Sequence, residues 1–154
     1  YFLPYTTASF TQTAGTSTAD PLLTAVPSGS TLYYYQLKGT SAYTETVNTS
    51  RENGTTFFTQ TLNLTLKGLT AKDLKQIKLL AYGRPQVIVE DNNGKLFYAG
   101  LKNGMEVTGG SIVTGAAMGD LSGFTLTIVG EEPVPANMII VSLTTAGVTV
   151  VSGT

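Results

Sequence analysis

The sequence predicts a mainly β protein, an antiparallel β-sandwich or barrel with a single short α-helix at about residues 71–82. Three observations support this prediction. The 154 residues include 26 threonines and 17 glycines but only 12% charged residues, a composition that favours strands over helix bundles. Several segments alternate between apolar and polar residues, as strands with one buried face do. Only one segment has helical periodicity.

Residues 56–66 show the strand pattern most clearly. Apolar side chains alternate there with Thr and Asn, and Gln60 alone places an amide on the side that we expect to be buried. Residues 43–47 form another β-prone run just before this segment. The polar stretch 48–54 lies between the two, so we expect a hairpin with a long loop.

A second hairpin is predicted around Asn93 and Gly94, because Asn-Gly is the strongest short-range hairpin signal. Its strands are expected at residues 86–90 and 95–99. The remaining predicted strands cover residues 31–37, 105–108, 111–114, 124–129, 138–143 and 148–152.

The predicted helix has identifiable ends. Thr70 is a good N-cap, Asp73 lies near the positive end of the helix dipole, and Gly83 supplies the C-terminal stop. The residues expected to face the core are Leu74, Ile77, Leu80 and Ala81, and those expected to face solvent are Lys72, Lys75 and Lys78.

The domain organisation follows from the distribution of these signals. Residues 1–30 are rich in Thr, Ser, Ala and Pro and lack a hydrophobic period, so we expect an extended N-terminal arm. Residues 31–154 are expected to form a single β-rich domain that ends in a C-terminal hairpin, 138–152. The chain opens without Met, so we interpret it as processed, trimmed or a fragment.

The composition argues against several classes of function. The chain has no His, no Cys and no Trp, so a Ser-His-Asp triad, a His or Cys zinc site, an iron–sulfur cluster and disulfides lack their atoms. We therefore predict no enzyme activity, no catalytic or metal-binding residues and no cofactor. The net charge of −1 disfavours reading of duplex nucleic acid. The most apolar run, 138–141, is far too short for a membrane span.

Four acidic residues have simpler structural interpretations than catalysis. Asp120, in the Gly-flanked stretch 119–123, is expected to accept backbone N–H bonds in a turn. Asp91 begins a turn that lacks the later Glu of a calcium loop. Glu131 and Glu132 are adjacent and point to opposite faces of a strand, so they are not a glycosidase pair, and we expect a solvated strand end.

One part of the chain resembles a known class of proteins. The segment from Leu79 to Ala136 resembles small structural proteins of tailed-bacteriophage virions, and the order of strands around one helix resembles the tail-tube protein family. The residues that carry the resemblance are Leu79-Leu80-Ala81-Tyr82-Gly83-Arg84-Pro85-Gln86-Val87-Ile88-Val89-Glu90-Asp91-Asn92-Asn93-Gly94, Val107-Thr108-Gly109-Gly110, Thr114-Gly115, Gly119-Asp120-Leu121-Ser122-Gly123-Phe124-Thr125-Leu126-Thr127 and Gly130-Glu131-Glu132.

This resemblance implies a subunit of a phage tail tube or head–tail connector, found in the virion and assembled in the cytoplasm of the bacterial host. Such proteins form stacked homo-oligomeric rings, usually hexameric, around a channel through which phage DNA passes transiently. The expected partners are further copies of the chain and other tail or connector proteins. Two alternatives stay open: an extracellular carbohydrate-binding or adhesive β-sandwich with Tyr33 and Tyr35 as its stacking platform, and a capsid decoration or head-fibre protein.

The distribution of charge suggests which segments meet other subunits. Before Lys38 the only charged residue is Asp20, and after Glu132 there is none. Uncharged segments bring little charge to desolvate in an interface, so we expect both ends of the chain to take part in assembly. The candidate assembly residues are Tyr33, Tyr35, Ile139 and Val141.

Overall fold

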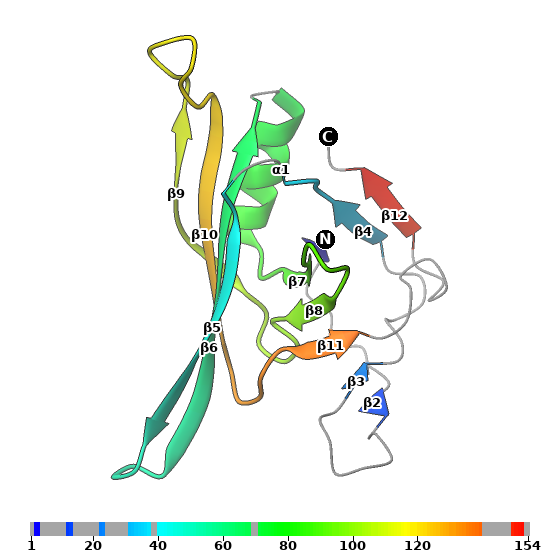
Figure 1. The fold of residues 1–154 in the computed structure, drawn as a ribbon, viewed down its shortest axis with the longest axis vertical. Helices are drawn as coiled ribbons and strands as arrows, with labels where there is room; N and C mark the ends of the chain where they lie inside the picture. Colours follow the sequence, from blue (N-terminus) through cyan, green and yellow to red (C-terminus); the bar gives the residue numbers. More distant parts are fainter. Residues whose placement is uncertain are drawn as a thin grey trace.

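The structure is a computed structural model, and it describes residues 2–3, 12–13, 22–23, 31–37, 40–68, 71–139 and 149–152. Two open sheets pack face to face, with one helix beside them (Figure 1). The prediction of a mainly β fold with one short helix is confirmed, and the open sheets make it a sandwich instead of a barrel.

The smaller sheet has four long antiparallel strands in the order β5-β6-β10-β9. Their bounds are β5 (Ala42–Ser50), β6 (Thr55–Lys67), β9 (Glu106–Val113) and β10 (Gly123–Glu132). Residues 105–108 and 111–114 were expected to be separate strands because of Gly109 and Gly110. The structure instead has one strand with a bulge, since Thr127 pairs with Gly109 and Ile128 with Val107.

The larger sheet has eight short strands in the order β12-β4-β1-β7-β8-β11-β3-β2. Their bounds are β1 (Phe2–Leu3), β2 (Gln12–Thr13), β3 (Leu22–Leu23), β4 (Thr31–Tyr34), β7 (Gln86–Glu90), β8 (Leu96–Ala99), β11 (Asn137–Ile139) and β12 (Thr149–Ser152). The β12–β4 and β11–β3 pairs are parallel, and the other pairs are antiparallel.

The described ends of the expected C-terminal hairpin (138–152), residues 138–139 and 149–152, do not pair with each other, and residues 140–148 lie outside the described residues. Strand β11 pairs with β8 and β3, whereas β12 pairs with β4 at the far edge of the same sheet. Both strands thus find partners that are distant in sequence. The apolar runs alone indicated two strands but held no information about which strands they would join.

Parts of the expected N-terminal arm belong to the larger sheet of the same chain. Strand β1 lies between β4 and β7, and Phe2 pairs with both Tyr33 and Val87. The Phe2 side chain is buried in the core. The described residues of this segment, 2–3, 12–13 and 22–23, therefore belong to the fold of the β-rich domain.

The core lies between the two sheets. The larger sheet contributes Phe2, Val87 and Ala99, which pack against residues of the smaller sheet and its connections, namely Leu62, Leu64, Met105, Leu126 and Ile128. Ile88 and Tyr98 are also buried, but they alternate with Val87 and Ala99 and so face away from the smaller sheet. The larger sheet is thus buried on both faces here.

Helix α1 (Ala71–Tyr82) has the predicted bounds. Ile77 and Leu80 pack against the core as expected. Leu74 and Ala81 were expected to face the core as well, but both are exposed. Arg84, just after the helix, forms an ion pair with Glu106 at the start of β9, with 3.1 Å between Nη2 and Oε1.

Candidate functional site

The four predicted assembly residues do not form one surface. Tyr33 on β4 is exposed, whereas the Tyr35 ring packs edge-on against Phe2, with ring centroids 5.6 Å apart. Ile139 is buried within its own chain and pairs with Leu96 and Leu23. Val141 lies outside the described residues. Tyr33 is therefore the one described candidate that is open to a partner in this structure.

The most prominent exposed feature is the tip of the β5–β6 hairpin. Strand β10 ends where Glu132 pairs with Phe58, so beyond this pair β5 and β6 continue without a third strand (Figure 1). Val47 lies opposite Phe58, while Phe57 lies opposite Asn48 and so points to the other face. Val47 is 58% exposed and Phe57 39%, so the projecting tip presents apolar side chains on both faces.

The opposite end of the smaller sheet carries the β9–β10 hairpin, which projects at the top of Figure 1. Its loop is held by Asp120, whose Oδ2 accepts hydrogen bonds from Ala116 N at 2.9 Å and Ala117 N at 2.8 Å. These bonds lower the pKa of the Asp120 carboxyl. The predicted turn role of Asp120 is therefore confirmed.

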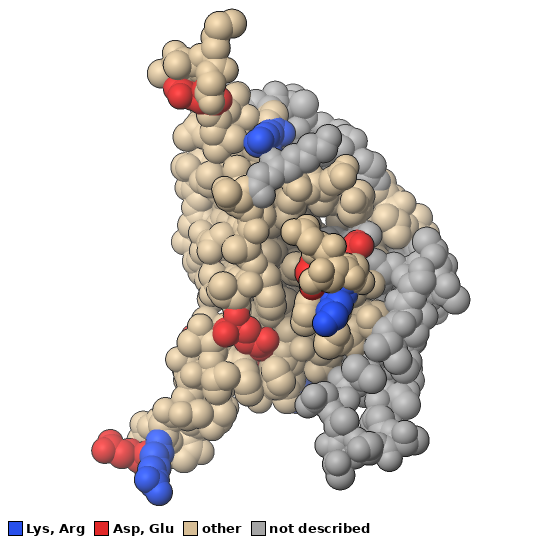
Figure 2. Space-filling view, in the orientation of Figure 1, with Lys and Arg blue, Asp and Glu red and all other residues tan. Residues whose placement is uncertain are grey.

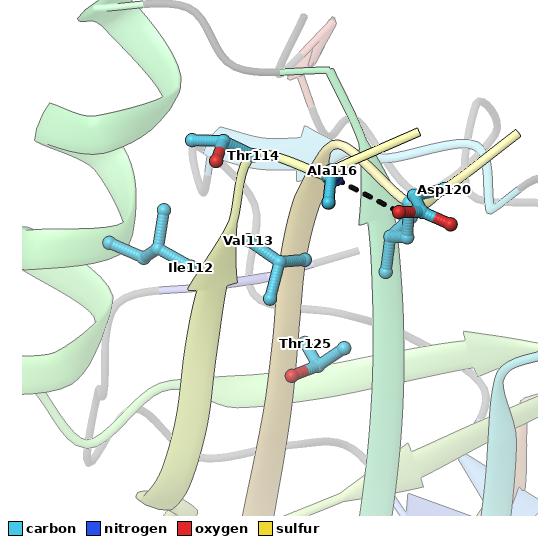
Figure 3. A pocket seen from close by; sticks show the side chains of 8 residues that line it. Ile112, Val113, Thr114, Ala116, Asp120 and Thr125 are labelled. Carbon is cyan, nitrogen blue, oxygen red and sulfur yellow. Dashed lines mark hydrogen bonds between the residues drawn. The ribbon is translucent and has the colours of Figure 1, made fainter. Parts of the chain in front are cut away.

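A hollow open to solvent lies between this loop and the strands (Figure 3). Ile112, Val113 and Thr125 line it from the strands, and the Asp120 carboxylate turns back to bind the loop backbone. One oxygen of this carboxylate, Oδ2, is bonded to backbone amides of the loop, while the strand residues that line the hollow offer apolar and hydroxyl contacts. Its shape is that of a surface depression next to an exposed Ile112.

Large exposed apolar side chains are spread over several elements, and those at the ends of the smaller sheet are only part of the set. Tyr82 at the end of α1 is 83% exposed. The complete set among the described residues is Tyr33, Leu37, Val47, Phe57, Leu74, Leu79, Tyr82, Ile112, Met118, Val150 and Val151.

The outer face of the smaller sheet is polar but uncharged over most of its area. The register pairs Thr44 with Thr61 and Asn63 with Thr127 across three strands. Thr127 Oγ1 donates a hydrogen bond to Asn63 Oδ1 at 3.0 Å. We call this surface the threonine face, and its members are Thr44, Thr46, Thr59, Thr61, Asn63, Thr65, Ser111, Thr125 and Thr127.

Two buried polar side chains join the sheets at the β5–β6 end. Gln60 accepts a hydrogen bond from Gly100 N at 2.9 Å and donates to Glu45 Oε1 at 3.3 Å. Glu132 Oε1 accepts hydrogen bonds from Lys102 N at 3.0 Å and Asn103 N at 2.7 Å. Both side chains thus bind the turn that follows β8.

Glu132 corrects the prediction of a solvated strand end. Its side chain is 1% exposed, whereas Glu131 beside it is exposed, as expected. The alternation of buried residues along β10 continues through Ile128 and Gly130 to Glu132. Extending this pattern by two residues would have identified Glu132 from the sequence.

Tyr43 is a half-buried residue near this cluster. Its ring stacks with Phe97 of the larger sheet at a centroid distance of 6.4 Å. Burial raises the pKa of the hydroxyl, and the negative charge of Glu45 raises it further. Among the described residues, Tyr43 Oη, Glu132 Oε2 and Asn137 Nδ2 are buried without a hydrogen-bond partner.

Within the described ranges, no group of three or more His, Cys, Asp or Glu side chains could hold a metal ion. No helix in the same part of the chain is long and apolar enough to cross a membrane. No protein-family model matches the chain, and searches of curated proteins and of solved structures find no match.

Proposed function

We propose that this chain is a virion structural protein, a subunit of a phage tail tube or head–tail connector that assembles into stacked rings. The observation that carries the proposal is the projection of the smaller sheet at both ends as hairpins with exposed apolar side chains. A two-stranded hairpin is at best marginally stable in water by itself. Burial of Val47 and Phe57 against a neighbouring subunit would stabilise the β5–β6 tip.

The edges of the two sheets also support self-assembly. Strand β12 forms one edge of the larger sheet, and both Val150 and Val151 on it are exposed. Strand β5 forms an edge of the smaller sheet over nine residues. Open edges recruit strands of other chains unless they are protected. Ring neighbours would cover these edges.

The threonine face suits the channel of such a ring. Lysine or arginine side chains in a channel would neutralise DNA phosphates and so retain the DNA by releasing counterions. Hydroxyl and amide groups bind phosphate without this salt-dependent attraction. In Figure 2, charged side chains are sparse on the visible face, and the lowest group coincides with the β5–β6 tip, where Arg51 and Glu52 lie. The hexameric ring number and passage of DNA come from the resemblance to tail-tube proteins.

The proposal is tested by negative-stain microscopy and light scattering of the purified chain at high concentration. We expect rings or tubes for the unchanged protein. Val47→Asp should abolish them, because it places a charge in the contact. Thr49→Asp adds the same charge to the same hairpin at an exposed polar position, and it should retain assembly.

Circular dichroism of both variants establishes that they are folded. A monodisperse monomer at all concentrations would overturn the proposal. Trimers without rings would overturn it in favour of the decoration-protein alternative. Equal effects of Val47→Asp and Thr49→Asp on assembly would show that the apolar side chains of the tip have no specific role in it.

A further inference from the structure

We propose that Asn53, at the tip of the projecting β5–β6 hairpin, is a site of spontaneous deamidation. The chain contains Asn-Gly dipeptides at 53–54, 93–94 and 103–104. They are equivalent in sequence, but the structure restrains them very differently. The inference concerns a covalent change in the folded chain and is independent of the proposed function.

The reaction needs only the dipeptide and water. The backbone nitrogen of the glycine loses its proton and attacks the asparagine Cγ. The bond from Cγ to Nδ2 breaks, ammonia leaves, and a cyclic succinimide forms. Water then opens the ring at either carbonyl to give aspartate or isoaspartate. Glycine favours the attack because it has no Cβ to hinder approach and permits many backbone conformations.

Asn103 is the most restrained of the three asparagines. Its Nδ2 donates to Glu131 O at 2.7 Å, and its backbone N donates to Glu132 Oε1 at 2.7 Å. The attacking nitrogen, Gly104 N, donates to Gly100 O at 3.2 Å, and Gly104 is buried. Succinimide formation here requires the turn after β8 to open.

Asn93 is restrained to an intermediate degree. Its exposed turn is organised by Asp91, which accepts hydrogen bonds from Asn93 N and Lys95 N at 2.8 Å each. Gly94 N donates to Asp91 O at 3.0 Å. The Asn93 Nδ2 group lies 3.5 Å from Asp91 Oδ2, at the limit of a hydrogen bond.

At Asn53 the described residues show neither of the two restraints found at Asn103, a hydrogen bond on the side-chain amide and one on the nitrogen of the following glycine. Among the described residues, neither the Asn53 side chain nor Gly54 N takes part in a hydrogen bond. The bond from Asn53 N to Ser50 Oγ, at 3.3 Å, involves an atom that does not react. Residues 51–54 are all exposed, and a Cβ added at Gly54 would meet nothing within 4 Å. The side chain is therefore free to approach Gly54 N.

The product changes the surface that the hairpin presents. Aspartate or isoaspartate adds a negative charge beside Glu52 and Arg51, at a tip whose neighbouring side chains include exposed Val47 and Phe57. Isoaspartate also lengthens the backbone by one carbon, which alters a turn that holds Gly54 at a φ of 63°. Ageing of the protein thus modifies this hairpin first.

Tryptic peptide mapping tests the inference directly. Cleavage after Arg51, Lys67, Lys95 and Lys102 places the three dipeptides in separate peptides. The unmodified protein is first separated by gel filtration. The fraction of lowest molecular mass is then incubated at mildly alkaline pH. Mass spectrometry then follows the mass gain from replacing the amide nitrogen by oxygen, and electron-transfer fragmentation identifies isoaspartate. The same measurement in urea gives the rate for each site without the fold.

We expect similar rates at all three sites in urea. In the folded protein we expect Asn53 to react fastest, with Asn103 at least about tenfold slower because several hydrogen bonds must open first. Asn53→Gln should leave the fold and the other two rates unchanged while removing the isoaspartate in its peptide. Equal rates in the folded protein, or slower reaction at Asn53 than at either other site, would overturn the inference.

Discussion

The Gln60 side chain accepts a hydrogen bond from the backbone N–H of Gly100 at 2.9 Å, which joins β6 of the smaller sheet to the end of β8 in the larger sheet. Gln60 is 1% exposed. Its other end donates to Glu45 Oε1, which also accepts a hydrogen bond from Ala136 N at 3.0 Å. The buried Gln60 amide therefore helps to hold the two sheets and the segment before β11 in position relative to one another.

Gln60→Leu should destabilise the protein although it adds an apolar side chain to an apolar face. It leaves Gly100 N buried without its acceptor, which costs about 1–3 kcal/mol in the free energy of unfolding. Urea denaturation followed by circular dichroism measures the loss. Thr46→Ala on exposed β5 is the matched control, with an expected change within about 0.5 kcal/mol. Equal midpoints for both variants would contradict the prediction.

Glu132→Ala should destabilise more than Glu131→Ala, although the residues are adjacent. Glu132 Oε1 accepts two backbone hydrogen bonds, from Lys102 N and Asn103 N, and losing this acceptor costs roughly 1–3 kcal/mol for each donor left without a partner. Glu131 is exposed, so its loss should cost less than about 0.5 kcal/mol. Thermal and urea unfolding of both variants test this difference. A smaller effect at position 132 would contradict it.

Residue periodicity predicted most of the fold's elements because each face of a strand has its own environment. The pattern in β6 identified the buried face and marked Gln60 as an exception. The pairing of strands was not predictable in the same way. β12 joins β4, and β1 inserts between β4 and β7. Such pairings depend on the whole set of competing partners, and two-residue strands have no periodicity to detect.

The sequence was less informative about the surfaces. Tyr33 and Tyr35 look equivalent in an alternating strand, but β4 ends at Tyr34 and the Tyr35 ring packs on Phe2. The exposure of Val47 and Phe57 was not predictable, because an apolar residue in a strand is expected to be buried. Their exposure follows from a relation between strands, namely that β10 ends opposite Phe58.

Gly110→Ala should be far more damaging than Gly109→Ala in the bulged strand β9. A Cβ at Gly110 would lie 2.5 Å from Thr125 O and 2.8 Å from Leu126 Cδ2, whereas a Cβ at Gly109 would meet nothing within 4 Å. Overpacking of this kind costs about 1–3 kcal/mol. Urea unfolding compares the two variants, and a loss at Gly109 that equals the loss at Gly110 would contradict the prediction.

The loop of the β9–β10 hairpin should loosen in acid. Hydrogen bonds from Ala117 N and Ala116 N hold the pKa of Asp120 below its ordinary value of 3.8. A lowered pKa in the folded state means that this contribution to stability is fully present above the ordinary pKa and is lost as the pH falls through the lowered one.

Amide NMR shifts of Ala116 and Ala117, titrated into acid, should therefore change with a midpoint below 3.8. Asp120→Asn should abolish that titration, because an amide does not ionise in this range. Gly119, next to Asp120, is exposed, and a Cβ added there would meet nothing within 4 Å. Gly119→Ala is therefore a control that should keep the same midpoint. A midpoint at or above 3.8 in the unchanged protein would contradict the assigned hydrogen bonds.

Phe2→Ala should unfold or strongly destabilise the isolated subunit. Phe2 is buried between the sheets and contacts Tyr35, and large-to-small changes at such sites cost about 3–5 kcal/mol. Val151→Ala at the exposed edge should cost less than about 1 kcal/mol. Urea unfolding at a concentration where the chain is monomeric separates these effects. Equal small losses would mean that β1 is dispensable for folding and would contradict the prediction.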